Sequence, residues 1–265
     1  MNTSGDNASG FDFDVSRWPA LPRLPGVFVT GTDTGVGKTL IAGAIARRLR
    51  RLGRRVEVFK PAASGCRWSR EELVSADAEF LAACADSRRP LRQIAPLRYA
   101  AALAPNVAAA RAGQAVDLAA MFDAYRRMEG QCECVVVEGV GGLLCPLSDE
   151  FWVIHFARMT SLPLVIVARA GLGTINHTLL TIHAARSAGL NVAGVVVNRY
   201  RTDGAGGDDV LAAATNPDQI AARGGVPVLA LAPDSPECSV ERATVGQDVQ
   251  FAVDQADWER IVFGR

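Results

Sequence analysis

Two lysines, a threonine and two carboxylates are the residues of this chain best placed to support chemistry on phosphates. Lys38 and Thr39 end the glycine-rich stretch 31–39, GTDTGVGKT, which lies between an apolar run and a helix-like run. In such a turn, free backbone N–H groups and the helix start bind an anion, the lysine adds positive charge, and the hydroxyl can reach a magnesium ion. The stretch therefore predicts a nucleoside triphosphate site.

The stretch departs from the strict P-loop pattern at one position. That pattern places a glycine five residues before Gly37, where this chain has Thr32. An ordinary glycine-rich turn between a strand and a helix is the alternative interpretation. The apolar run before the turn and the helix-like run after it favour the phosphate site.

Three further charged residues lie where predicted strands or helices begin or end. Glu138 follows three valines, and with Thr39 it would supply part of an octahedral set of oxygen ligands for magnesium. Asp77 is a second candidate carboxylate, although its local sequence equally fits a charge at a helix N-terminus. Lys60 directly follows a strand and could neutralise charge in phosphoryl transfer, or it could be an ordinary solvated lysine.

A second anion site is predicted around residues 171–177. The sequence Gly171-x-Gly173 leads into an amphipathic helix, so the amides of the turn would face an anion such as a substrate carboxylate. His177 and His183 are six residues apart and do not share a helix face. We interpret both histidines as ordinary polar positions rather than metal ligands.

Six short apolar runs must position these side chains. Such continuous runs indicate strands covered on both faces, and the helix-like segments between them indicate right-handed crossovers. We therefore expect a doubly covered, mainly parallel α/β sheet, with ligands beyond the carboxyl ends of its strands. The predicted strands are residues 27–29, 56–59, 135–137, 164–167, 195–197 and 228–231, and the predicted helices include residues 40–46 and 178–187.

Bulk composition narrows the classes of function. The 265 residues are 49% hydrophobic and 21% charged, with a formal net charge of zero, which does not favour nucleic acid or a membrane as a partner. Six cysteines without a Cys-x-x-Cys pair indicate reduced thiols in a cytoplasmic protein. No apolar run is long enough to span a bilayer, and the N-terminus lacks a signal-peptide pattern.

The two ends of the chain differ in composition. Residues 1–24 are rich in Ser, Gly, Asn, Asp and Pro, which predicts a mostly disordered extension that is dispensable for catalysis. The isolated aromatic residues Phe11, Phe13 and Trp18 could hold it against the body. Residues 25–265 are expected to form a single P-loop α/β domain.

Five motifs in sequence order together resemble the dethiobiotin synthetases. They are residues 31–39, residues 59–61 with 64–65, residues 75–78, residues 137–142 with 146–147, and residues 170–177. The resemblance implies that the chain carboxylates 7,8-diaminopelargonate with CO2 and closes a ureido ring through a carbamic-phosphoric anhydride. ATP and Mg²⁺ would be required, the products would be dethiobiotin, ADP and phosphate, and the protein would be a homodimer with the P-loop topology of that family.

The resemblance also implies roles for individual residues. Lys60 would be the catalytic lysine that neutralises the carbamate, and Lys38 would hold the phosphates. Magnesium ligands would be Thr39, Asp77 and Glu138. Substrate contacts would come from Thr34, Ser64, Gly173, Thr174, Ile175 and Asn176, the last four across a dimer interface. Nucleotide contacts would come from Thr34, Gly35, Val36, Gly37, Lys38, Thr39, Leu40, Asp77, Glu138, Gly139, Val140, Gly141, Asn198, Arg199, Pro233, Asp234 and Ser235.

Two positions depart from the family pattern, and one competing class remains. Gly35 stands where some members carry glutamate, and Asn106 replaces a common histidine. The alternative is a partitioning-type P-loop switch ATPase, which would carry a lysine at the position of Asp33. This chain has the opposite charge there, and the switch class lacks the features at Lys60 and Asn176.

Overall fold

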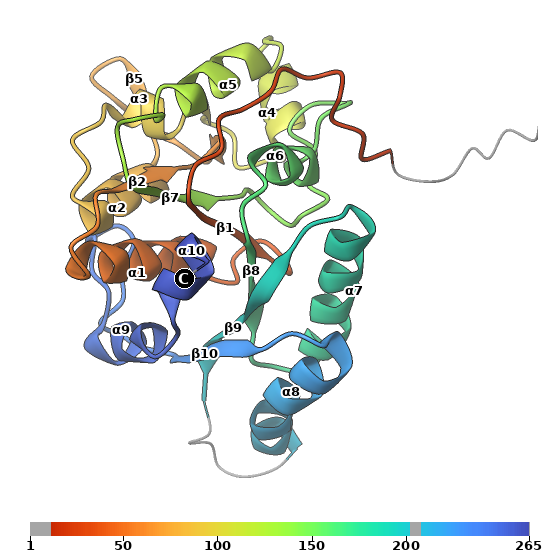
Figure 1. Ribbon diagram of the computed structural model, residues 1–265. Coiled ribbons are helices and arrows are strands. Elements are labelled where there is room, and N and C mark those ends of the chain that lie inside the picture. The colour runs from red at the N-terminus through yellow and green to blue at the C-terminus, as the bar shows by residue number, and fades with distance from the viewer. Residues whose placement is uncertain (1–11, 202–207, 265) are drawn as a thin grey trace, which may run out of the picture.

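The protein is described here from a computed structural model, in which residues 12–201 and 208–264 are placed (Figure 1). Among these residues, the main sheet has six strands in the order β10-β9-β8-β1-β7-β2, and every pair of neighbours is parallel. The expected parallel sheet is thereby confirmed. Its strands are β1 (Gly26–Gly31), β2 (Val56–Phe59), β7 (Cys134–Glu138), β8 (Leu164–Arg169), β9 (Val192–Tyr200) and β10 (Val228–Pro233).

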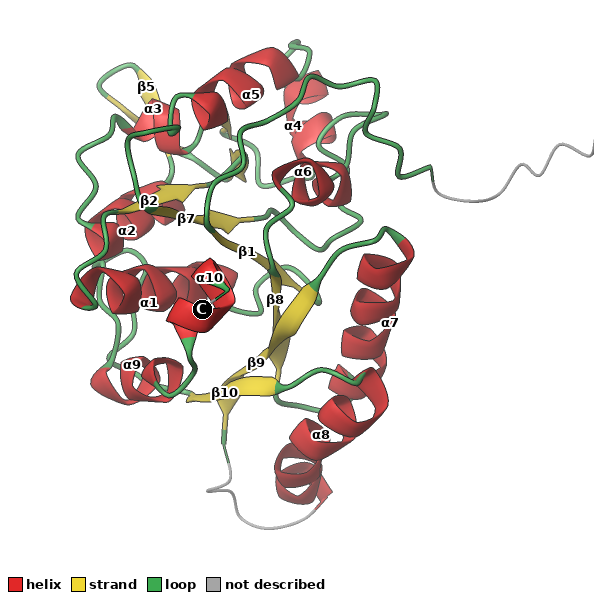
Figure 2. Ribbon diagram, in the orientation of Figure 1, coloured by secondary structure: helices red, strands yellow, loops and turns green. Residues whose placement is uncertain are grey.

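Helices cover both faces of this sheet (Figure 2). One hydrophobic cluster, which includes Ile41 and Trp258, lies under α1 (Lys38–Arg51), α2 (Ala76–Ala85), α9 (Gln247–Asp254) and α10 (Trp258–Phe263). The other, which includes Phe28 and Phe156, lies under α5 (Leu118–Arg126), α6 (Val153–Thr160), α7 (Thr174–Ser187) and α8 (Asp208–Gly224). Because the strands are covered on both faces, successive side chains must all be apolar, and this explains the continuous apolar runs.

Two small sheets and two short helices were not predicted from apolar runs. Strand β3 (Ala62–Ser64) pairs in parallel with β6 (Leu97–Tyr99), while β4 (Arg67–Ser69) and β5 (Glu72–Val74) form an antiparallel hairpin. Each of these strands is three residues long, and β4 is exposed throughout, so neither its length nor its hydrophobicity identifies it as a strand. The short helices are α3 (Leu91–Ile94) and α4 (Pro105–Arg111).

Helix α1 begins directly at the phosphate-loop lysine. Gly37 precedes it with a left-handed backbone (φ 96°) and offers no side-chain cap, so the first N–H groups of the helix are free to face a ligand. Arg48, Arg50 and Arg51 occupy the last turn, where positive charge is favourable. In the described part of the chain, no helix has the length and apolar character needed to cross a membrane.

The N-terminal extension is only partly described. Residues 1–11, including Phe11, lie outside the described residues, so the predicted disorder there stays a prediction. Residues 12–25 run across α6 and α5 before entering β1 (Figure 1), and Phe13, Trp18, Leu21 and Leu24 pack against the hydrophobic core. Phe13 and Trp18 thus hold this segment against the body, as their aromatic character suggested, and Leu21 and Leu24 add to the contact.

Candidate active site

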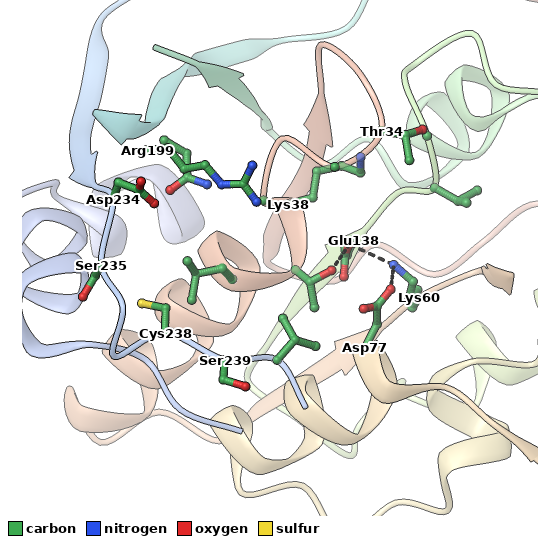
Figure 3. Close-up of a pocket in the computed structure, with 18 of the residues that line it drawn as sticks. Thr34, Lys38, Lys60, Asp77, Glu138, Arg199, Asp234, Ser235, Cys238 and Ser239 are labelled. Carbon is green, nitrogen blue, oxygen red and sulfur yellow. Dashed lines mark hydrogen bonds and ion pairs between the residues drawn. The ribbon is translucent and has the colours of Figure 1, made fainter. Parts of the chain in front are cut away.

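Beyond the carboxyl ends of the strands lies a pocket of about 560 Å³ (Figure 3). Most of the sequence-predicted nucleotide and substrate residues line it, although they come from six separate segments of the chain. These are Thr34, Gly35, Gly37, Lys38, Thr39, Leu40, Lys60, Ser64, Asp77, Glu138, Val140, Gly141, Asn198, Arg199, Pro233, Asp234 and Ser235.

Some predicted residues lie elsewhere, and three lining residues were not predicted. Val36 and Gly139 are buried behind the pocket wall, and residues 173–176, at the start of α7, do not line this pocket. The unpredicted residues are Cys238, Ser239 and Val240. They follow Pro233–Ser235 in sequence, so extending that segment would have found them, but no motif marks them.

A buried lysine lies between two carboxylates at the base of the pocket. The Nζ of Lys60 is 2.8 Å from Oε1 of Glu138 and 2.9 Å from Oδ2 of Asp77. The side chains of Lys60 and Glu138 are only 4% and 1% exposed. Lys60 follows β2, Glu138 ends β7, and Asp77 lies in the first turn of α2, whose first residue follows the capping Ser75. Asp77, which local sequence left undecided, therefore belongs to the site.

The pKa values of the two lysines of the pocket are shifted in opposite directions. Burial opposes the charge on Lys60, but the attraction of Glu138 and Asp77 outweighs it and raises the lysine pKa. Burial also raises the pKa of Glu138, and the neighbouring Lys60 opposes that rise. For Lys38, burial lowers the pKa, and Glu138 only partly offsets this. Lys60 is thus a fixed cation rather than a proton acceptor.

The oxygen atoms around Glu138 fit a magnesium ion. Thr39 donates its hydroxyl hydrogen to Oε1 of Glu138 over 2.8 Å, whereas Oε2 of Glu138 is buried without a hydrogen-bond partner. Hydroxyl and carboxylate oxygens are the ligands that this ion prefers. No group of three or more His, Cys, Asp or Glu residues able to hold a metal occurs among residues 12–201 and 208–264. A cation here would therefore need further oxygens, such as those of nucleotide phosphates.

An asparagine from β9 is joined to the phosphate loop. Asn198 donates from Nδ2 to the carbonyl oxygen of Val36 over 2.8 Å, and a Cβ added at Gly37 would overlap the same amide nitrogen. The contact with a carbonyl fixes which amide atom is the nitrogen. The other amide atom, the oxygen Oδ1 of Asn198, is then a buried acceptor without a partner. Lys38 donates to the carbonyl oxygen of Asp33 over 2.9 Å and so remains beside the loop.

The start of α7 carries an unusual concentration of positive potential. Gly173 precedes the helix with φ 86° and without a side-chain cap. A Cβ added at Gly173 would lie 3.4 Å from Nη2 of the exposed Arg169, and the buried hydroxyl of Thr174 has no hydrogen-bond partner. A cation is unfavourable at a helix N-terminus unless an anion joins it. The geometry therefore supports the predicted anion site and adds Arg169, which sequence analysis missed.

Comparison with known proteins shows the family to which the chain belongs. The model of the AAA domain family matches residues 25–242. The ATP-dependent dethiobiotin synthetase BioD of Anaeromyxobacter sp. (strain K) is 41% identical over 223 residues, which cover 84% of this chain and 96% of that protein. The chain belongs to the AAA domain family and to the dethiobiotin synthetases. A second dethiobiotin synthetase, from Bacillus subtilis (strain 168), is 39% identical over 79% of this chain and 87% of its own length.

Two solved structures of proteins with other names share this fold. The MinD cell division protein of Aquifex aeolicus superposes with a TM-score of 0.56 at 13% identity, covering 91% of this chain and 97% of its own. A ParA family ATPase from Chlorobium tepidum gives 0.53 at 12% identity, covering 86% and 96%. At such low identity these likenesses show a shared fold and nothing about the reaction.

Proposed function

We propose that this chain is an ATP-dependent dethiobiotin synthetase, an enzyme that joins 7,8-diaminopelargonate and CO2 into a ureido ring. The observation that carries the proposal is the buried Lys60, held between Glu138 and Asp77 next to the phosphate loop. A simple ATPase needs no second fixed cation at that place. A ligase that brings an anionic carbamate to an anionic phosphate does need one.

The pocket suits ATP in both its charge and its hydrogen bonding. The phosphates would lie on the amides of residues 34–39 and beside Lys38, whose charged form an anion would favour. The free Oδ1 of Asn198 can accept a hydrogen bond from the amino group of adenine, whereas the carbonyl oxygen of guanine would repel it. Pro233, Asp234 and Ser235 would flank the base.

Mg²⁺ would be held by Thr39, Asp77 and Glu138 together with the nucleotide. When bound, it would neutralise charge on the phosphates. Asp77 and Glu138 would then share their negative charge between this ion and Lys60. The unpartnered Oε2 of Glu138 is the atom in the described structure that most directly supports this assignment.

The proposed reaction needs two anions to approach in line. An amine of the diamine takes up CO2 to form a carbamate, whose oxygen attacks the γ-phosphate while ADP leaves. The second amine then attacks the carbonyl carbon, closing the ring with loss of phosphate. Lys60 would offset the carbamate charge, and Thr34 and Ser64, which line the same pocket, would orient the carbamate by hydrogen bonds.

The substrate carboxylate would be bound by a second copy of the chain. Residues 173–176 with Arg169 would form the anion site discussed above, yet they lie outside the lining of this chain's own pocket. Beside them, Leu172 and Leu180 are 80% and 59% exposed, as expected for residues covered in an assembly. A homodimer in which this turn reaches the partner's pocket satisfies both observations. We place the enzyme in the cytoplasm.

The proposal is tested by measuring phosphate release from ATP and magnesium, with and without 7,8-diaminopelargonate and bicarbonate. Dethiobiotin is followed by mass spectrometry. We expect release that depends on the diamine, with one ureido product for each phosphate. Diamine-independent hydrolysis without that product would favour the switch ATPase, whose fold this chain shares. The Asp33 position, which lacks the lysine of that class, argues for the synthetase.

A further inference from the structure

We infer that residues 12–24 form a strap that fixes the loop 141–152 from its outer side, and that Trp18 is a positioning residue for the diamine. This inference rests on the proposed function for the identity of the substrate, and it departs from the expectation that residues 1–24 are dispensable for catalysis. The strap precedes the matched family domain, which begins at residue 25. The strap itself therefore lies outside the residues that the family model matches, although the residues it contacts lie inside them.

The strap is attached to α6 through a buried histidine. His155 is 3% exposed, and its Nδ1 accepts a hydrogen bond from the backbone N–H of Trp152 over 2.9 Å. Because Nδ1 is an acceptor, the proton of the neutral ring lies on Nε2, which donates to the carbonyl oxygen of Asp12 over 2.8 Å. Arg158, near the end of α6, donates to the carbonyl oxygen of Phe13 over 2.7 Å. One helix thus holds the strap backbone at two points.

Trp18 connects the strap to the loop. Its ring lies 4.8 Å from that of Phe151 at 74°, and 5.1 Å from that of His155. Arg17 lies over the tryptophan ring at 4.2 Å and donates to both the carboxylate and the backbone carbonyl of Glu150. The Arg17–Glu150 ion pair is exposed and contributes little, so the aromatic contact is the main attachment.

Phe151 in turn closes the loop on itself. It is fully buried, and its carbonyl oxygen accepts hydrogen bonds from Leu147 and Ser148, each over 2.8 Å. Pro146 and Trp152 form an isolated bridge across the same loop. Because these bonds join both ends of the turn and its side chain is tightly packed, a shift of Phe151 should move the whole turn.

The far end of this loop is a wall of the active site. Gly141 lines the pocket, and a Cβ added there would lie 2.9 Å from Sγ of Cys145 and 3.8 Å from Oγ1 of Thr34. The carbonyl oxygen of Cys145 accepts from Val153 over 3.0 Å, at the start of α6. The loop therefore lies beside Thr34, the residue proposed to orient the carbamate, and of the loop residues only Gly141 is also an expected nucleotide contact. The proposed base contacts come from β9, from the end of β10 and from the residues directly after it, and none of the strap contacts named above involves these segments.

Because the loop lies beside Thr34 and away from the proposed base contacts, loosening it should affect the two substrates differently. Trp18→Ala should raise the KM for 7,8-diaminopelargonate about tenfold while the KM for ATP changes less than about twofold, because only the substrate wall loosens. Trp18→Phe keeps an aromatic ring and should restore most of the affinity. Phe251→Ala removes an exposed aromatic ring of α9 and serves as the matched control, with both KM values unchanged.

Hydrogen exchange gives an independent measurement of the same effect. Amides of residues 141–152 should exchange faster in Trp18→Ala than in the wild-type protein, and those of residues 228–240 should not. If Trp18→Ala does not fold, the exposed Arg17→Glu, which repels Glu150, tests the strap with a smaller shift in the same direction. Equal increases in both KM values, or a lowered Tm with unchanged KM values and unchanged exchange, would overturn the inference. If the wild-type protein makes no dethiobiotin, the proposed function fails, and the exchange experiment alone still decides on the strap.

Discussion

At the scale of single residues, the pocket separates two tasks that a positive charge can perform. Lys60 is locked between carboxylates and remains charged whether or not a ligand is bound. Lys38 is buried beside backbone atoms, so its charge is costly until an anion arrives. The first lysine is therefore suited to a reacting carbamate, and the second to a phosphate that comes and goes.

Replacing Lys60 should separate nucleotide binding from chemistry. We expect Lys60→Ala to bind ATP with nearly unchanged affinity while dethiobiotin formation falls by about 10²- to 10³-fold, because the carbamate loses its counter-charge. Calorimetric titration with ATP and product detection by mass spectrometry give the two quantities. Lys38→Ala is the contrasting variant and should lose ATP binding. Weakened ATP binding by Lys60→Ala with normal turnover at saturation would assign Lys60 to the phosphates instead.

The depressed pKa of Lys38 makes ATP binding depend on pH. A phosphate stabilises the charged lysine, so ATP binding should take up a proton, and affinity should fall as pH rises through the lysine pKa, which lies below its ordinary value. Titrations in buffers of different ionisation enthalpy measure this uptake at neutral and alkaline pH. Lys38→Arg keeps its charge throughout and should flatten the dependence. An equally steep dependence in Lys38→Arg would place the titrating group elsewhere.

At the scale of elements, the sequence predicted those site residues that lie at the ends of neighbouring parallel strands. Lys60 and Glu138 were expected near each other because each ends a buried apolar run, and β2 and β7 pair with Phe59 opposite Val137. The pairing of β3 with β6, Ala62 opposite Leu97, could not be predicted, because three residues carry no periodic signal and their partner is distant in sequence. The lining residues 238–240 were also missed, because no sequence pattern marks the contact that holds them. In that contact the backbone N–H of Gly246, before α9, donates to Sγ of Cys238.

The junction of β9 with the phosphate loop gives a test at this scale. Gly37→Ala should abolish measurable ATP binding, because the added Cβ overlaps the Asn198 amide and the backbone has φ 96°. Gly35→Ala is the matched comparison: it also has positive φ, 75°, but nothing lies within 4 Å of its added Cβ. It should cost only the backbone strain of about 1–3 kcal/mol. Thermal unfolding and ATP titration of both variants measure these effects, and equal losses would show that strain alone matters.

At the scale of the whole molecule, the proposed site requires residues from two chains. The turn 173–176 and Arg169 are the proposed carboxylate site, and they lie outside the pocket, whereas the starts of α1 and α2 that line the pocket are assigned to phosphates and magnesium. Such a division makes oligomeric state part of catalysis rather than a feature of stability alone.

Mixing two inactive variants tests this shared site. Lys60→Ala and Asn176→Ala homodimers should each be nearly inactive. After the two are mixed and allowed to exchange subunits, activity should recover to about a quarter of the wild-type value, because half of the dimers are mixed and each mixed dimer holds one intact site. Product formation before and after mixing is the measurement. No recovery, with subunit exchange verified by mass spectrometry, would place both residues in the site of one chain.

The position of β1 in the sheet has a consequence for how the chain reaches its structure. Phe28 of β1 pairs with Val137 on one side and with Leu164 on the other, and no neighbouring strand in the main sheet is joined to β1 by a hairpin. Contacts this distant in sequence slow folding, because long loops must close before any pairing is gained. We therefore expect the phosphate loop that follows β1 to take shape late, once β7 and β8 have been brought to β1. The strap, although it comes early in the chain, must wait for α6.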